Sequence, residues 1–246
     1  MHGPMSPGAR SALFAPLDQT GRAETVAARL ADAITLGLLA DAEQLPSETE
    51  LANRFGVATV TVREALLALR RRGLIETRRG RGGGSFVRTP ARAGRGGFAL
   101  LRSVSLTELR DIGDHYAAIA GSAARLAAER GSADDIERLE LATEDLRAAT
   151  DTAISRAERL FHLEVAAAAQ SPRLTREEAR LQSGPGGLLW LPPDDPAAVA
   201  AARAAHEDIT AAIAAADGET ARRRTEEHVL ETVGRLVDRH LALLGR

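Results

Sequence analysis

Residues 45–87 read LPSETELANRFGVATVTVREALLALRRRGLIETRRGRGGGSFV and decide the fold of the first part of the chain. Ser47 is followed three residues later by Glu50, which is the spacing of a capping box, and this predicts a helix over 48–55. Gly56 then provides a tight turn between two helices. A second helix is predicted over 59–72, because apolar residues recur there at helical spacing.

Two short strands, 74–78 and 85–87, follow these helices, and an Arg- and Gly-rich hairpin joins them. Helix, turn, second helix and basic hairpin together form a winged helix-turn-helix, an arrangement whose common use is to read duplex DNA. The candidate DNA-binding residues are Ser47, Thr49, Thr59, Thr61, Arg63, Arg78, Arg79, Arg81, Gly82 and Gly83.

Charge is unevenly distributed along the chain. Residues 21–95 hold 13 Arg and 8 acidic residues, a net charge of +5, whereas residues 96–246 hold 18 Arg and 25 acidic residues, a net charge of −7. A basic first part on an acidic remainder predicts a nucleic-acid partner for the first part only. For Arg70, Arg71 and Arg72 the alternative is a solvated helix end that the helix dipole favours.

Composition limits the remaining possibilities. The chain has 246 residues, enough for two domains, and aromatic residues make up only 3%, which favours helices over sheets. There is no Cys, so disulfides, thiolate metal sites and Cys nucleophiles are excluded. No apolar run approaches the ~20 residues of a membrane span. We expect a cytoplasmic protein without a membrane partner.

The organisation predicted from these patterns is mostly α-helical. A flexible arm over 1–21 precedes the winged helix-turn-helix domain, 22–88, whose first helix is expected at 22–38. The segment 89–104 is rich in Arg, Gly and Pro at its start and is expected to be a linker. The remainder, 105–246, is expected to be an all-helical bundle of six or seven helices that binds metal and effector and dimerises.

Four histidines fall in the predicted bundle: His115, His162, His206 and His228. Glu158 lies four residues before His162, so the two share a helix face. His206 and His228 lie on two helices joined by a turn near residue 217, which would bring their imidazoles to a similar height. Three imidazoles and one carboxylate would make a divalent-metal site, although a lone His on an apolar face is more often a core residue. His115, beside Tyr116, would point elsewhere, and no role is expected for His2 or His240.

Two sets of motifs resemble known families. The segments LPSETELANRFGV, VREAL and RRRGLIETRRGRGGGSFV resemble the DNA-binding domain of the GntR family of bacterial transcription regulators, over about residues 22–88. The segments ERLFHLEVAAAAQSPRL, AHEDITAAIAAAD and EEHVLETV resemble the FCD ligand-binding domain of the FadR subfamily, over about residues 105–244.

The resemblance implies a homodimer that binds a palindromic double-stranded DNA operator. It also implies a metal held by Glu158, His162, His206 and His228. Zinc or nickel is expected first, and manganese, iron or cobalt are alternatives. The usual acidic ligand of the family is Asp, so the longer Glu158 is a departure.

Further departures concern specificity. Thr49 and Thr59 stand where family members often have Arg, which indicates an unusual operator or a heavier reliance on the wing. In the first bundle helix, Tyr116 and Ala120 stand where relatives have Arg and Glu. The arginine that would bind a carboxylate effector is thus absent. We therefore expect that the effector is not a simple organic acid, or that the metal alone holds its carboxylate. Tyr116 and Trp190 are candidate effector-pocket residues, and the Gly- and Pro-rich segment around Trp190 is either a loop pinned to the bundle or a lid.

The sequence thus predicts a ligand-responsive DNA-binding transcription regulator, a repressor released by a small-molecule effector. The alternative is a regulator for which the metal itself is the signal. A reading in which the histidines only fill the core, and the ligand is apolar, also stays open. An enzyme is not expected, because no spare general base with a clear partner is visible.

Overall fold

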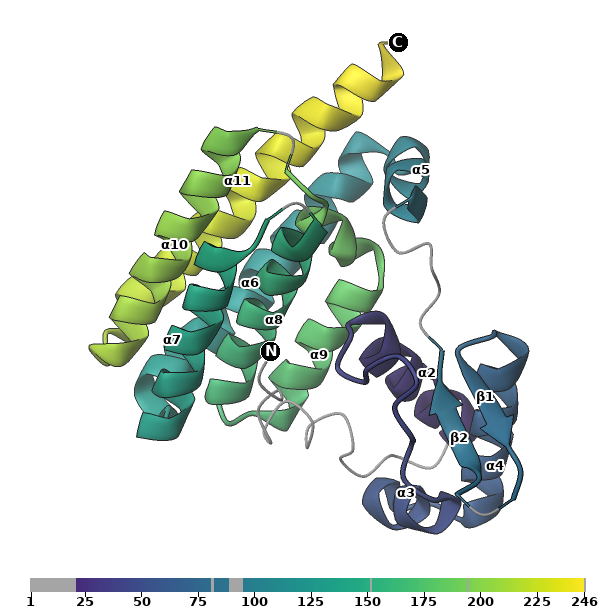
Figure 1. The fold of residues 1–246 in the computed structure, drawn as a ribbon. Coiled ribbons are helices and arrows are strands. Elements are labelled where there is room, and N and C mark those ends of the chain that lie inside the picture. Colours follow the sequence, from purple (N-terminus) through teal and green to yellow (C-terminus); the bar gives the residue numbers. More distant parts are fainter. Residues whose placement is uncertain (1–20, 81, 89–94, 151, 194, 246) are drawn as a thin grey trace. The chain divides into compact units, whose positions relative to one another are not determined.

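The computed structural model describes residues 21–80, 82–88, 95–150, 152–193 and 195–245 (Figure 1). The expected arm, apart from Gly21, and the first part of the expected linker, 89–94, lie outside the described residues. The chain divides into two compact units, 1–93 and 94–246. Among the described residues, no helix is long and apolar enough to cross a membrane.

The described residues of the first unit form three helices and a β-hairpin, as the sequence predicted. These elements are α2 (Arg22–Thr35), α3 (Glu48–Phe55), α4 (Thr59–Arg71), β1 (Ile75–Arg78) and β2 (Gly84–Val87). Helix α2 ends three residues earlier than expected, because Gly37 takes a left-handed conformation with φ 71°. The core of this unit lies between the helices and includes the buried side chains of Val26, Leu30, Ile34, Leu51, Phe55, Val62, Leu66 and Leu69.

The capping box predicted at the start of α3 is present. The Ser47 hydroxyl accepts a hydrogen bond from the backbone N–H of Glu50 at 3.3 Å, and the Glu50 carboxylate accepts one from the backbone N–H of Ser47 at 2.9 Å. At the other end, Gly56 has φ 66°, a left-handed conformation that favours glycine. Local sequence therefore fixes both ends of α3 and the turn into α4.

The hairpin is antiparallel, with Ile75 opposite Val87 and Arg78 opposite Gly84. Its tip depends on Gly83, where a Cβ atom would lie 2.6 Å from the carbonyl oxygen of Arg78. The segment before α3 joins the sheet, since Leu45 donates a backbone hydrogen bond to the Ser85 carbonyl at 2.8 Å. This additional pairing was not predicted, and it ties the wing to the start of the helix-turn-helix.

The second unit is an all-helical bundle, which confirms the predicted fold class (Figure 1). Its elements are α5 (Arg95–Ser103), α6 (Leu106–Arg130), α7 (Ala133–Ala148), α8 (Thr152–Ala168), α9 (Pro172–Ser183), the 3₁₀ helix η1 (Pro185–Trp190), α10 (Pro196–Ala214) and α11 (Gly218–Leu244).

Helix α5 corrects the expected linker, because it occupies most of that segment. Leu101 and Val104 are buried in the same core cluster as residues of α6 and α11. The Gly and Arg residues around 89–97 obscured this short apolar stretch. The structure therefore assigns residues 95–104 to the bundle.

Small residues on α6 allow α11 to pack closely against it. A Cβ atom at Gly113 would lie 2.6 Å from a Val233 methyl group, and one at Gly121 would lie 2.7 Å from the Glu226 side chain. Along the same helix, Ala117, Ala120 and Ala124 are buried. This close approach brings α11, with His228, into the centre of the bundle.

Candidate functional site

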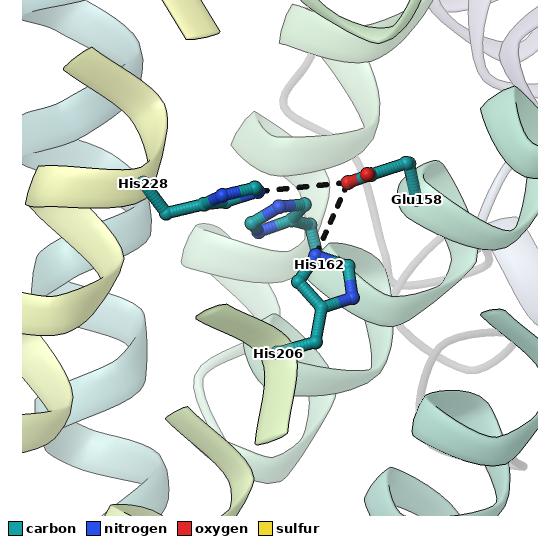
Figure 2. A group of neighbouring side chains, drawn as sticks. All are labelled: Glu158, His162, His206 and His228. Atoms are coloured by element: carbon teal, nitrogen blue, oxygen red, sulfur yellow. Dashed lines mark ion pairs between the residues drawn. The ribbon is translucent and has the colours of Figure 1, made fainter. Parts of the chain in front are cut away.

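Four side chains from three helices meet inside the second unit. Glu158 and His162 lie on α8, His206 lies on α10 and His228 lies on α11 (Figure 2). All four are buried, and one potential ligand atom from each lies within 4.8 Å of the others. The structure therefore brings together the four residues that the sequence singled out for metal binding.

Local structure explains how these residues converge. Glu158 and His162 are four residues apart on α8 and so project from one face of that helix. Helices α10 and α11 are joined by a tight turn in which Ala216 has φ 56°, and the Asp217 side chain caps α11 by accepting from the backbone N–H of Thr220 at 3.0 Å. The two helices run antiparallel from this turn (Figure 1). His206 and His228 therefore lie side by side, with ring centres 5.0 Å apart.

The Glu158 carboxylate faces two of the imidazoles. Its Oε2 atom lies 3.1 Å from Nε2 of His206 and 3.5 Å from Nε2 of His228 (Figure 2). Neither contact has hydrogen-bond geometry. These three atoms are buried without a hydrogen-bond partner, as are Nδ1 of His206 and both ring nitrogens of His162. Since buried polar atoms in proteins nearly always have partners, this group of orphaned donors and acceptors needs an explanation.

Burial and the neighbouring side chains shift the pKa values of the cluster toward the protonation states that metal binding requires. Desolvation lowers the pKa of His162 well below its usual value, and the neighbouring His206 and His228 lower it further. Desolvation likewise lowers the pKa of His206. For Glu158, burial acts to raise the pKa, but His206 and His228 outweigh it and hold that pKa well below its usual range. Neutral imidazole and ionised carboxylate are the forms that bind metals.

The donor set fits a divalent transition metal. Ligand atoms about 2.0–2.2 Å from one ion lie about 3 to 3.5 Å apart, which matches the contacts of Glu158 with His206 and His228. Imidazole and carboxylate suit zinc, nickel, cobalt, iron and manganese alike, and the chain has no Cys to favour zinc. Four protein donors would leave further positions open on a six-coordinate ion.

In the first unit, the candidate DNA-binding residues other than Arg81 are exposed or half-buried around α3, α4 and the hairpin. Thr59 and Thr61 lie in the first turn of α4, and Arg63 follows them with its guanidinium 2.9 Å from the Glu48 carboxylate. Val60 in the same turn is 57% exposed, an apolar residue that the sequence analysis passed over. The sequence could have identified Val60 as a candidate contact residue, because it lies between Thr59 and Thr61 at the start of the second helix of the helix-turn-helix.

The candidate DNA-binding residues of the hairpin differ in their contacts and exposure. The Arg78 guanidinium contacts Glu76 at 2.8 Å and lies 4.3 Å from the centre of the Phe86 ring, so it is partly held by its own hairpin. Arg79 is exposed and Gly82 and Gly83 form the tip, while Arg81 lies outside the described residues.

Comparison with known proteins identifies the family. Residues 22–84 match the model of bacterial regulatory proteins of the gntR family, and residues 111–231 match the FCD domain. The chain is 41% identical over 241 residues to RmpR, a Mycobacterium gastri protein named as an HTH-type transcriptional regulator. The aligned residues make up 95% of this chain and 87% of RmpR. The chain belongs to the GntR family.

A second sequence relative and a solved structure support the same assignment. An uncharacterized HTH-type transcriptional regulator of Mycobacterium tuberculosis, Rv0494, is 36% identical over 154 residues, 62% of each chain. The solved structure of E. coli McbR/YncC has the same fold, with a TM-score of 0.54 and 22% identity over 90% of this chain and all of that one. This GntR-family chain is thus a DNA-binding transcription regulator with an FCD effector-binding domain, and not an enzyme.

An aromatic wall covers one side of the histidine cluster in this GntR-family chain. The Trp190 ring stacks on His162, with ring centres 4.3 Å apart, and its Nε1 donates to the Tyr116 hydroxyl at 3.0 Å. Leu188, Leu189 and Trp190 are at most 4% exposed. In this structure the segment around Trp190 is therefore pinned to the bundle, and Tyr116 is fully buried beside it.

Glu178 on α9 is a buried residue that the sequence analysis missed. Tyr116 donates its hydroxyl to Glu178, and Gln182 donates to the same oxygen at 2.8 Å. Burial raises the pKa of Glu178 to about 7, although both hydrogen bonds act to lower it. Its signal in the sequence was its place on the inward face of α9, four residues after Leu174.

The two described histidines outside the cluster, His115 and His240, have different surroundings. His115 is half exposed, 3.8 Å from Glu177, and does not join the cluster, as expected. His240, for which no role was expected, is buried, and its Nδ1 lies 2.8 Å from the Leu101 carbonyl oxygen. It connects the end of α11 to α5.

Proposed function

We propose that this GntR-family regulator is a repressor that leaves its operator when a small molecule binds over a divalent metal in the FCD domain. The ligands of this metal are Glu158, His162, His206 and His228. The observation that carries the proposal is the buried group of ring nitrogens and carboxylate oxygen that lack hydrogen-bond partners. A bound ion satisfies one ring nitrogen of each histidine together with the carboxylate oxygen, and it provides a positive centre for an electron-rich effector atom.

The chain's own residues prepare this site. Burial keeps the pKa of His162 and His206 low, so that their nitrogen lone pairs are free at neutral pH. Phe161 stacks on His206, with ring centres 3.8 Å apart, and Trp190 stacks on His162, which limits how far either imidazole turns. The ligands are thus oriented before any ion arrives, which reduces the entropic cost of binding.

On the DNA side, we propose that a homodimer binds a palindromic operator, with α4 in the major groove and the hairpin against the adjacent backbone. Arg63 reads a base edge from the exposed face of α4, and its contact with Glu48 orients the guanidinium. Exposed Val60 contacts a thymine methyl group. Thr59 and Thr61 supply shorter polar contacts, and Arg79 and Arg81 bind phosphates.

Regulation requires that the effector bind more tightly to the state of the protein that does not bind DNA. We therefore expect operator affinity to fall when the effector is added to metal-loaded protein. A rise in affinity would contradict repression with release.

The first experiment measures metal content of the purified protein by inductively coupled plasma mass spectrometry. We expect about one ion per chain in the wild type and none in a His162→Ala/His206→Ala/His228→Ala variant. His115→Ala is the matched control, because His115 is an exposed histidine of the same domain, and it should keep its ion. Failure of the wild type to bind zinc, nickel or manganese would overturn the metal site.

A second measurement distinguishes the alternative, in which the metal is the signal. Operator affinity is compared by fluorescence anisotropy for metal-free and metal-loaded protein without any organic ligand. Equal affinities support a resident metal and an organic effector. A large change at micromolar metal would instead make the protein a metal sensor.

A further inference from the structure

Trp190 covers two of the candidate metal ligands in the FCD domain. Its ring stacks on His162 with ring centres 4.3 Å apart, and it also stacks against His228 with ring centres 5.7 Å apart. These contacts occupy no imidazole nitrogen, and both ring nitrogens of His162 are buried without a hydrogen-bond partner. Trp190 therefore limits the movement of the two imidazoles and leaves their nitrogens available to an ion.

Trp190 also controls access to the cluster from one side. The indole is 2% exposed, and it lines a cavity of about 60 Å³ that is partly open to solvent and reaches Glu158. Leu188 and Leu189 line the same cavity, so η1 forms one wall of it. Displacement of Trp190 would widen this opening onto Glu158, and water or a competing ligand would then reach the cluster more easily.

A buried chain of hydrogen bonds fixes the indole. Nε1 of Trp190 donates to the Tyr116 hydroxyl at 3.0 Å, and that hydroxyl donates to the Glu178 carboxylate. An indole N–H can only donate, and a phenol has a single proton. Tyr116 therefore accepts from Trp190 and uses its own proton for Glu178. This chain is complete only if the side chain at position 178 is an acceptor.

Glu178 is itself anchored by its neighbours. Its Oε1 atom accepts from Gln182 at 2.8 Å, and the same amide group of Gln182 donates to the Arg159 carbonyl of α8 at 3.0 Å. The network thus joins η1 to α6, α8 and α9. The side chains of Tyr116, Glu178, Gln182 and Trp190 are at most 4% exposed, so water does not replace these hydrogen bonds.

We infer that Tyr116 and Glu178 are positioning residues that hold Trp190 as a cover over the candidate metal and thereby slow the exchange of the ion. The inference rests on the function proposed above, because it concerns the same metal. The side chain at position 178 acts as an acceptor, so an uncharged acceptor of the same shape should hold the cover equally well.

The first measurement is acrylamide quenching of Trp190, the only Trp of the chain, in metal-free full-length protein. Tyr116→Phe removes the hydroxyl between Trp190 and Glu178 and keeps the ring. We expect the displaced state of the indole to become about tenfold more populated, because a buried donor without a partner is unfavourable. Stronger quenching and emission at a longer wavelength report this change.

The second measurement is the rate at which zinc-loaded full-length protein releases zinc to a colorimetric chelator. Tyr116→Phe should release zinc about tenfold faster than the wild type, because the displaced state opens the cluster. Glu178→Gln keeps an acceptor and should match the wild type in both measurements. Glu178→Leu removes the acceptor and should match Tyr116→Phe. The double variant Tyr116→Phe/Glu178→Leu should release zinc no faster than either single variant, because both changes break one chain.

Thr175→Val is the matched control. Thr175 is a buried residue of α9, the helix of Glu178, and its hydroxyl donates to the Ala166 carbonyl of α8 at 2.9 Å. The substitution removes a buried hydroxyl outside the chain of hydrogen bonds that ends at Trp190. It should match the wild type in quenching and in zinc release. If Glu178→Leu does not fold, Tyr116→Phe and Glu178→Gln still decide.

Wild-type quenching and wild-type zinc release in Tyr116→Phe would overturn the inference. Stronger quenching with unchanged release would also overturn it, because Trp190 would then not cover the ion. Equal acceleration in Thr175→Val would assign the effect to a loosened bundle. A wild type that binds no metal removes the proposed function and the exchange step with it. Quenching of the metal-free protein still decides whether Tyr116 and Glu178 hold Trp190.

Discussion

The two units of the chain present their candidate functional residues in opposite ways. In the DNA-binding unit, Ser47, Thr59 and Arg63 are exposed, lie within 17 positions of one another and are positioned by local features such as a helix cap and a turn. In the FCD unit, Glu158, His162, His206 and His228 are buried and come from three helices. The candidate DNA-binding surface therefore depends on local structure, whereas the candidate metal site depends on how the helices of the bundle pack together.

The largest expected effect tests this dependence on packing. A metal that binds the folded FCD domain but not the unfolded chain should stabilise the domain by about 4 kcal/mol when its concentration is 1,000 times Kd. Thermal unfolding followed by Trp190 fluorescence should therefore shift upward with metal in the wild type and stay unchanged in the triple histidine variant. An equal shift in both proteins would mean that the ion stabilises the chain elsewhere.

The second prediction concerns Glu178, whose folded pKa of about 7 lies above its ordinary value of 4.5. The folded state binds this proton more tightly than the unfolded state. The resulting stability is therefore fully present below pH 4.5 and is lost as the pH rises to about 7. The loss is roughly 3 kcal/mol at most, at about 1.4 kcal/mol for each pKa unit.

Denaturant unfolding between pH 5 and 8 checks this prediction. Glu178→Gln, which keeps the shape but cannot ionise, should lose less stability over this range than the wild type. Glu177→Gln is the control, because Glu177 is the adjacent, less buried carboxylate of α9. Parallel pH profiles for the wild type and Glu178→Gln would show that Glu178 does not titrate in this range.

The third prediction concerns two arginines of the exposed candidate DNA-binding surface. Arg63→Gln should weaken binding to the operator by about 1–3 kcal/mol and should relax specificity at one base pair. Arg79→Gln should weaken binding to all sequences alike and reduce the salt dependence by about one phosphate contact. Anisotropy titrations at several salt concentrations measure both. Sequence-independent weakening by Arg63→Gln would assign that side chain to the phosphate backbone.

The smallest effects compare two helix caps. Ser47 caps α3 in the DNA-binding unit and Ser132 caps α7 in the FCD unit, each in a capping box. Replacement of either by Ala should cost about 1 kcal/mol of stability. Only Ser47→Ala should lower operator affinity, because only α3 belongs to the helix-turn-helix. A similar loss of operator affinity in Ser132→Ala would mean that the stability of the FCD unit also controls DNA binding.

The sequence predicted most elements of both units, because caps, turns and apolar spacing are local signals. The capping box of Ser47 and Glu50 is present, and the glycine turn at Gly56 is where the pattern placed it. Helix α5 was missed, because its apolar residues are few and glycine and arginine surround them. Its helical state is favoured by burial of Leu101 and Val104 in the bundle.

The sequence by itself, through its resemblance to known families, predicted the family, the helical bundle and the four candidate metal ligands. Spacing along the chain pairs Glu158 with His162 on α8, and His206 with His228 across the α10–α11 turn. Only the tertiary structure decided what surrounds them. The stacking of Trp190 on His162, the burial of Glu178 against Tyr116 and the cavity that reaches Glu158 join residues from different helices. These contacts depend on how closely whole helices pack, and no local pattern of residues encodes that distance.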